Sequence, residues 1–162
     1  MAVKCAKAAF HGSVANGATE GTFIAAYTGT LAAPSTTHCS SDLGTLDINM
    51  NSCAYILTGT TVNGDAKIWV ECALGSNEII IKATELGVTL KVPAQTPTSG
   101  GVHYTNVANG DVRVDATVEG ITWTCEPKLA CNLGLGGTEG NNADYTGSVT
   151  VAGANNIAFS EE

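Results

Sequence analysis

Hydrophobic and polar residues alternate along much of the chain with the period of two that marks a β-strand with one buried face. The clearest run lies in residues 102–125, where small apolar residues alternate with charged and polar ones over 112–119. An Asn-Gly pair at 109–110 precedes this alternation, and Asn-Gly is the strongest short signal for a hairpin turn. Gly120 indicates a second reversal, into 121–124. We therefore expect a three-stranded meander here.

The same alternation predicts further short strands along the chain. They are expected at 4–14, 22–30, 46–50, 53–61, 66–72, 78–84, 88–92 and 145–153. The continuous apolar run at 79–81 is typical of a strand buried on both faces, which favours two layers. Repeated short strands with frequent turns indicate a sandwich or barrel. We predict an all-β fold, an antiparallel sandwich of about ten short strands with disulfides. It forms a single β domain over 1–162, with a flattened or open β-barrel as the alternative.

Several segments carry turn or loop signals instead. We expect loops at 31–38 and 93–101, a turn at 63–65, and the longest irregular segment at 126–144. Within the last, 134–144 combines glycines with acidic and amide side chains, which are oxygen ligands that Ca²⁺ accepts. The spacing differs from that of an EF-hand, and the same residues dominate ordinary turns. We therefore interpret this segment as a loop and expect no metal.

Length and charge narrow the classes of function. A chain of 162 residues can bury a core of its own. Its 7 basic and 15 acidic residues give a net charge of −8, which disfavours nucleic acid and anionic membranes as partners. No apolar run reaches the roughly 18–20 residues of a membrane helix, so no membrane insertion is expected. The N-terminus lacks a signal-peptide core, so either export takes another route or Met1 replaces a removed signal peptide.

The cysteines point to an oxidising compartment. They are Cys5, Cys39, Cys53, Cys72, Cys125 and Cys131. An even number without a CxxC pair fits three disulfides, the alternative being six buried thiols in a reduced protein. Spacing favours Cys39–Cys53 and Cys125–Cys131 as local bridges, which leaves Cys5–Cys72. A crossed set, Cys72–Cys125 with Cys5–Cys131, stays open.

The sequence contains few candidate catalytic residues. The three histidines, His11, His38 and His103, have no metal-ligand spacing and lie in no nucleophile motif. A serine, His103 and Asp111 are the residue types of a catalytic triad, but most β domains contain such a set. We expect no catalytic site and no cofactor, and hence a protein that is not an enzyme.

The two tryptophans receive different predictions. Trp69 falls on the strand face of Lys67 and Glu71. An exposed aromatic there is a possible ligand contact, as a sugar platform or an interface anchor. Trp123 is expected to cover the edge of the core near Cys125.

Several stretches carry a family resemblance. They are Cys5 with Ala8-Ala9-Phe10, DINMNSC at 47–53, WVECALGSNEIII at 69–81, the run 101–123, and YTGSVTVAG at 145–153. Together they resemble a group of small secreted, uncharacterised β-rich proteins of soil actinobacteria. Members tend to carry a cysteine at the position of Gly87, as a plausible partner of the one at Cys72. Its absence here, with Cys125 additional, implies another partner for Cys72. The resemblance implies an extracellular or cell-envelope location and no particular activity.

These observations favour a non-enzymatic secreted or cell-surface structural protein, a self-assembling, filament-like or adhesion module. Its partner would be another copy of itself, joined through edge strands or through the N-terminal run 1–12 added to a neighbour's sheet. One alternative is a carbohydrate or small-ligand binding module that uses Trp69. Another is a virion decoration or tail protein.

Overall fold

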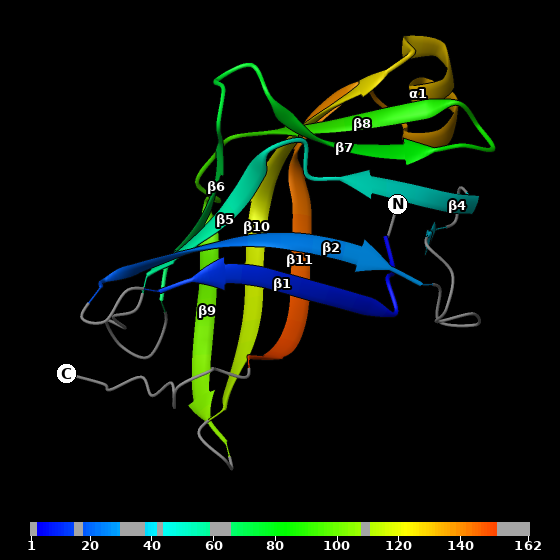
Figure 1. Cartoon of the computed structure of the whole chain (residues 1–162). Helices are drawn as coiled ribbons and strands as arrows, with labels where there is room; N and C mark the ends of the chain where they lie inside the picture. The colour runs from blue at the N-terminus through cyan, green and yellow to red at the C-terminus, as the bar shows by residue number, and fades with distance from the viewer. Residues whose placement is uncertain are drawn as a thin grey trace.

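The computed structural model describes residues 3–14, 18–29, 38–41, 44–58, 66–107 and 111–151. In these ranges the chain forms two antiparallel sheets and one short helix (Figure 1), which confirms the predicted all-β fold. The strands are β1 (Lys7–Ser13), β2 (Glu20–Thr28), β3 (Cys39–Ser41), β4 (Gly44–Asn49), β5 (Cys53–Thr58), β6 (Ile68–Cys72), β7 (Glu78–Ala83), β8 (Val88–Pro93), β9 (Ser99–Asn106), β10 (Val112–Glu126) and β11 (Glu139–Val151). The helix is α1 (Lys128–Leu135). Residues 31–37 of the predicted loop at 31–38, and the predicted turns at 63–65 and 109–110, lie outside the described residues.

The smaller sheet has the strand order β1-β2-β5-β6, and the larger one runs β11-β10-β8-β7-β4-β3. Strand β10 is long enough to hold two neighbours on one side, since its first half pairs with β9 and its end pairs with β8. Strand β11 follows β10 on the other side. In Figure 1, β1 and β2 cross in front of β9, β10 and β11. The molecule is therefore a two-layer structure in which the layers cross.

Two isolated bridges join the layers along one side. Ala66 pairs with Val102, and Val70 pairs with Gln95. Each bridge consists of two backbone hydrogen bonds, with N···O distances of 2.7 to 3.0 Å. The edge beside β6 is therefore tied to the larger sheet.

The predicted reversal at Gly120 is wrong, because β10 continues through it. Gly120 has a φ of 74°, and the register with β11 shifts between Val118 and Ile121. These are the marks of a β-bulge, which bends a strand without ending it. A Cβ atom on Gly120 would lie 1.8 Å from the Thr98 hydroxyl oxygen, so both the positive φ and the close contact require glycine.

The predicted irregular segment at 126–144 is wrong too. It contains α1, which ends at Gly136 in the left-handed conformation typical of a helix C-terminus, and the first half of β11. Residues 139–143 are polar and small, yet Ala143 pairs with Ile121, and Gly140 with Trp123. Pairing with β10 therefore overrides a weak strand propensity. The calcium-loop alternative loses its basis, because the segment is extended.

The core consists of three apolar clusters. The first joins α1 to β3, β4, β7, β8 and the end of β10, the second lies between β6 and the strands β9 to β11, and the third lies between the sheets around Met50 and Val70. Trp123 packs on the first cluster, which also contains Cys125, as the sequence predicts. Among the described residues no charged or polar residue is buried. A functional site formed by the described polar residues must therefore lie at the surface.

The disulfides are Cys5–Cys39, Cys53–Cys72 and Cys125–Cys131. The last is a pairing that the spacing favours. The proposed Cys39–Cys53 bridge is wrong, because Cys39 is bonded to Cys5 and Cys53 to Cys72.

Strand register explains the actual pairs. Cys53 and Cys72 stand directly opposite each other on β5 and β6. Lys4 pairs with Ser40 on β3, which brings Cys5 to its partner and excludes the expected Cys5–Cys72 bridge.

Candidate functional site

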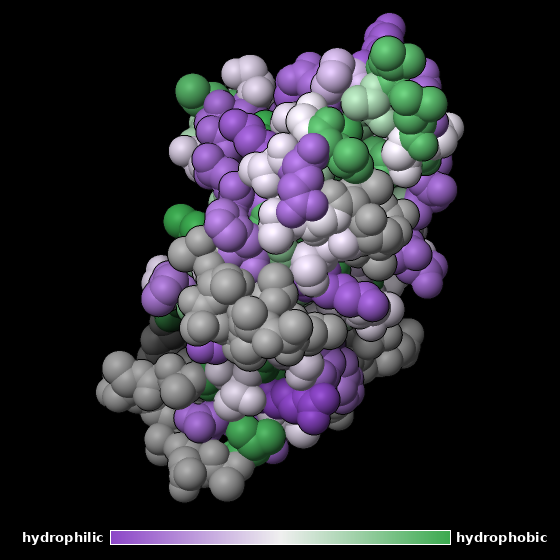
Figure 2. Space-filling view, turned by 90° about the vertical axis from the view of Figure 1, so that its right-hand side faces the viewer, coloured by the Kyte–Doolittle hydropathy of each residue, from purple (hydrophilic) through white to green (hydrophobic). Residues whose placement is uncertain are grey.

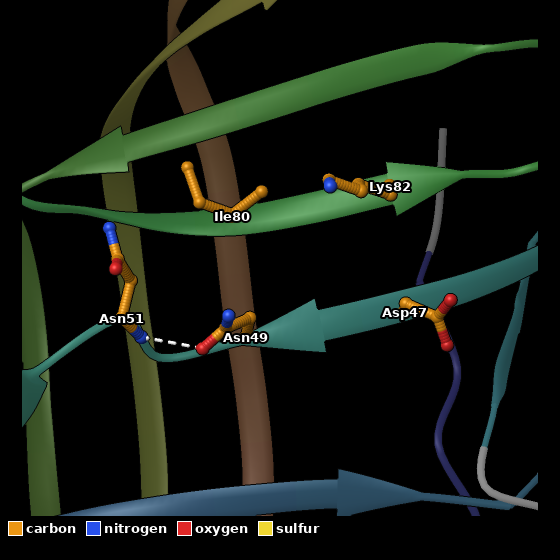
Figure 3. A pocket seen from close by; sticks show the side chains of 5 residues that line it. All are labelled: Asp47, Asn49, Asn51, Ile80 and Lys82. Carbon is orange, nitrogen blue, oxygen red and sulfur yellow. Dashed lines mark hydrogen bonds between the residues drawn. The ribbon is translucent and has the colours of Figure 1, made fainter.

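A shallow hollow of about 300 Å³ opens on the outer face of β4 and β7 (Figure 3). It is lined by Asp47, Asn49, Asn51, Ile80 and Lys82. Alternate residues of a strand share a face, and the register sets Asp47 opposite Lys82 and Asn49 opposite Ile80. Strand pairing therefore assembles four lining residues, and the turn after β4 adds Asn51.

Two hydrogen bonds fix the amide groups of the hollow. The backbone N–H of Asn51 donates to Asn49 Oδ1 at 2.8 Å, as drawn in Figure 3. The side-chain Nδ2 of Asn51 donates to the carbonyl of Glu78 at 3.2 Å. Each amide is therefore held at one end and leaves its other end for a further partner.

The charges of the hollow balance. Asp47 carries a carboxylate that contacts His38 Nδ1 at the rim. Lys82 lies across the strand pair, and no ion pair of Lys82 is seen within the described ranges. No group of three metal-ligating side chains occurs among the described residues either. The hollow therefore presents mixed polar groups without a metal-binding cluster.

Sequence reasoning missed this hollow. The alternation around Asp47 and Asn49 predicts only a half-buried strand. The available signal is that the outward positions carry Asp and Asn, which are depleted in strands, whereas Thr is common there.

Trp69, the predicted ligand contact, lies on β6 and not in the hollow. Its ring is half-buried and stands opposite Ile56 on the outer face of the smaller sheet. The indole N–H donates to Glu71 Oε1 at 2.9 Å. Trp69 is thus already held by neighbours, and its role as a ligand contact stays a prediction.

The histidine considered for a triad lies in a cross-strand row on the open face of β9, β10 and β11. Asp115 stands opposite His103 on one side and Ser148 on the other. A hydrogen bond from Ser148 and the Arg113 guanidinium hold the pKa of Asp115 below its ordinary value. In a nucleophilic triad the imidazole lies between the serine and the carboxylate. Here the carboxylate lies in the middle, so this row does not place His103 to take a proton from Ser148.

A cluster of aromatic rings joins the two sheets. The hydroxyl of Tyr27 lies 3.0 Å from that of Tyr55 and 3.4 Å from that of Tyr145, and Phe10 packs edge-on against Tyr27. Burial raises the pKa of Tyr55 to about 12, and burial with the neighbouring phenols raises the pKa of Tyr27 further. The phenols of Tyr27 and Tyr55 therefore stay protonated, and the cluster acts as a contact between the layers.

The surface also carries an apolar ridge on α1. Figure 2 shows hydrophobic side chains gathered at the end of the molecule that carries this helix. Leu129 and Leu133, one turn apart, are 75% and 82% exposed, while Cys131 between them is fully buried. The disulfide to Cys125 thus fixes the helix with its leucines outward.

No protein-family model matches the chain, and no curated protein or solved structure matches it either. The resemblance to secreted actinobacterial proteins therefore stays a prediction. Among the described helices none is long and apolar enough to cross a membrane.

Proposed function

We propose that the protein is a non-enzymatic structural module, secreted or displayed at a cell surface, that forms filaments by adding strand β1 of one copy to strand β11 of the next. The observation that carries this proposal is the exposed edge of β11. Unpaired backbone groups along a sheet edge are a template for a strand from another chain.

The sheet edges differ in how they are protected. Among the described strands, the sheet edges are β1, β6, β3 and β11, and β9 is an edge as well because it pairs only with β10. Strand β3 has only three residues, and β6 is tied to the larger sheet by its two bridges. Short strands and covered edges are the usual defences against unwanted pairing. The outer side of β9 is held by the bridge of Val102 to Ala66, so β1 and β11 are the long edges that no bridge covers in the described part of the chain.

The second half of β11 lacks the residues that usually prevent pairing at a sheet edge. Residues 145–151, YTGSVTV, contain no charge and no proline, and most are residues that favour strands. Charged side chains and proline are what protect natural sheet edges, and their absence marks a segment that accepts a partner strand. No described strand pairs with the outer side of β11.

Strand β1 is complementary to β11. The face of β1 that looks toward the other layer carries Phe10, and the equivalent face of β11 carries Tyr145 and Val149. Lys7 on β1 and Asp144 on β11 carry opposite charges, which attract each other when these two edges approach. A contact between two different edges does not close on itself, so it builds an open filament.

Of the two donors that the sequence suggests, an edge strand and the N-terminal run 1–12, the proposal uses the edge strand. Residues 4–13 are engaged within their own chain, through the bridge of Lys4 to Ser40 and the pairing of β1 with β2. The N-terminal run is therefore not a free arm, and only the outer edge of β1 is offered to a neighbour. The three disulfides support an oxidising, extracellular setting.

Light scattering after size-exclusion chromatography, over a wide concentration range, together with negative-stain microscopy, tests the proposal. We expect mass to rise with concentration and filaments to form. Thr146→Lys places a charge on the β11 edge and should abolish both effects. Thr117→Lys is the matched control, since Thr117 stands opposite Thr146 on β10, a strand paired on both sides.

Three outcomes would contradict the proposal. A strict monomer at every concentration argues against assembly. A closed dimer argues against the contact between β1 and β11. Equal loss of assembly in both lysine variants shows that added charge, and not the edge, is responsible.

A further inference from the structure

The hollow on β4 and β7 presents polar atoms whose identity is fixed by their backbone partners. A backbone N–H can only donate, so the atom of Asn49 that faces the N–H of Asn51 is Oδ1, and Nδ2 is left for a ligand. A carbonyl can only accept, so the atom of Asn51 that faces Glu78 O is Nδ2, and Oδ1 is left for a ligand. The hollow thus offers one amide donor and one amide acceptor in set orientations.

The turn that carries Asn51 is held firmly. Asn51 and Ser52 have φ values of 47° and 62°, which are left-handed conformations that Asn tolerates well. The N–H of Cys53 donates to the carbonyl of Met50 at 2.7 Å, and Cys53 is bonded to Cys72. A group fixed in advance loses little entropy when a ligand binds. The Asn51 amide is therefore positioned before any ligand arrives.

The charges of the hollow select against ions. An anion attracted by Lys82 would meet the carboxylate of Asp47, and a cation attracted by Asp47 would meet the ammonium group of Lys82. A neutral ligand with many hydroxyls can donate to Asp47 and Asn51 and accept from Lys82 and Asn49. Ile80 adds an apolar surface for C–H groups. The volume of about 300 Å³ lies at the small end of ligand sites, which suits a single sugar residue.

We propose that this hollow is a binding site for a neutral, polyhydroxylated ligand, a single sugar residue of a larger glycan. The site lies on the outer face of β4 and β7 and uses neither β1 nor β11. It is therefore independent of the filament contact. A filament of such modules would present one site per copy.

Nuclear magnetic resonance titration of the whole protein tests the site. The probes are glucose, galactose, mannose and N-acetylglucosamine, each added separately, with sodium phosphate and calcium chloride as ionic probes. We expect saturable shifts of the amide signals in 47–52 and 80–82 with at least one sugar, with a dissociation constant on the order of millimolar. Neither ionic probe should saturate these signals.

Three variants locate the binding groups. Asn51→Gly keeps the left-handed turn and removes the amide, and Lys82→Met removes the ammonium group. Each should weaken sugar binding at least about tenfold, as expected for the loss of a hydrogen bond to a charged or preorganised group. Lys91→Met is the matched control, since Lys91 faces the same side from β8, outside the hollow. Thermal unfolding of each variant verifies its folding. If Asn51→Gly does not fold, Lys82→Met alone tests the proposal.

The proposal fails if none of the four sugars gives saturable shifts in the hollow. It also fails if Lys82→Met binds as tightly as the unchanged protein, or if Lys91→Met weakens binding equally. Saturation of the same signals by phosphate or calcium without any sugar response would assign the hollow to an ion and overturn it.

Discussion

The two ends of β10 are stabilised in opposite ways. At the end next to α1, the bonds Cys5–Cys39 and Cys125–Cys131 lie in one buried cluster, and β3 closes the sheet with a very short edge. At the other end, β10 lies between β9 and β11, no disulfide crosses these strands, and the inward residues of β11 are only half-buried. Covalent bonds and short strands complete one end within the chain, whereas the other end has the β11 edge, to which no described strand pairs and which we propose as the site of assembly.

Removal of disulfides gives the largest expected effects on stability at the braced end. The bond Cys5–Cys39 closes 34 residues, and Cys125–Cys131 closes 6. In the chain-entropy model these loops correspond to about 4 and about 2 kcal/mol of free energy of unfolding. Urea unfolding of the two double-alanine variants should therefore show the larger loss for Cys5→Ala/Cys39→Ala. Equal losses would show that loop length does not set the contribution of these bonds.

The phenol cluster, which joins β11 to the smaller sheet, predicts alkaline instability. Tyr55 has an ordinary pKa near 10 when unfolded and about 12 when folded, so the folded state holds the proton longer. Stability is therefore complete below pH 10 and falls as the pH rises toward 12. The loss from Tyr55 alone reaches about 3 kcal/mol.

Urea unfolding at pH 9, 10 and 11 measures this loss. Tyr55→Phe should reduce the slope of the free energy of unfolding against pH by the contribution of one titrating proton. Tyr104→Phe is the comparison outside the cluster. Burial also raises the pKa of Tyr104 to about 12, and its hydroxyl donates to the carbonyl of Thr58 at 2.8 Å, so this variant should reduce the slope as well while the phenol cluster stays intact. A flat profile in the unchanged protein would contradict the protonated phenol contact.

The bulge at Gly120 lies between the two ends of β10. Gly120→Ala imposes a side chain at a φ of 74° and against Thr98, and should cost about 2 kcal/mol. Gly75→Ala is the matched control, because a Cβ there meets nothing within 4 Å and no positive φ is involved. Thermal unfolding compares the two variants. A similar small effect in both would show that the bulge tolerates relaxation.

The sequence predicts the repeated strands well and the joints between them poorly. Alternation correctly indicates β4, β6, β8 and β10, since each has one buried face. It fails at Gly120, where a turn residue serves a bulge, and at 139–143, where pairing with β10 imposes a strand on polar residues. Both outcomes depend on neighbours that are distant in the chain.

The sequence predicts even less of the candidate site than of the fold. The spacing of the outward residues of β4 is visible in the sequence, but Lys82 and Ile80 join them only through the register with β7. The same limit explains the disulfides. Cys53 and Cys72 meet because β5 and β6 pair in one register, and chain distance carries no such information.

The smallest expected effect lies at the open end, in the row that links β10 to β11. A hydrogen bond from Ser148, followed by the Arg113 guanidinium, lowers the pKa of Asp115 in the folded state. Its stabilising effect is therefore present above the ordinary pKa of an aspartate and is lost as the pH falls through the lowered value. A pH titration of the Asp115 carboxyl by nuclear magnetic resonance should show a rise of the pKa in Ser148→Ala and a smaller rise in Arg113→Met. An unchanged pKa in Ser148→Ala would mean that β11 is not held against β10 through this group. The open end would then depend on backbone pairing alone, which makes its contrast with the disulfide-braced end sharper still.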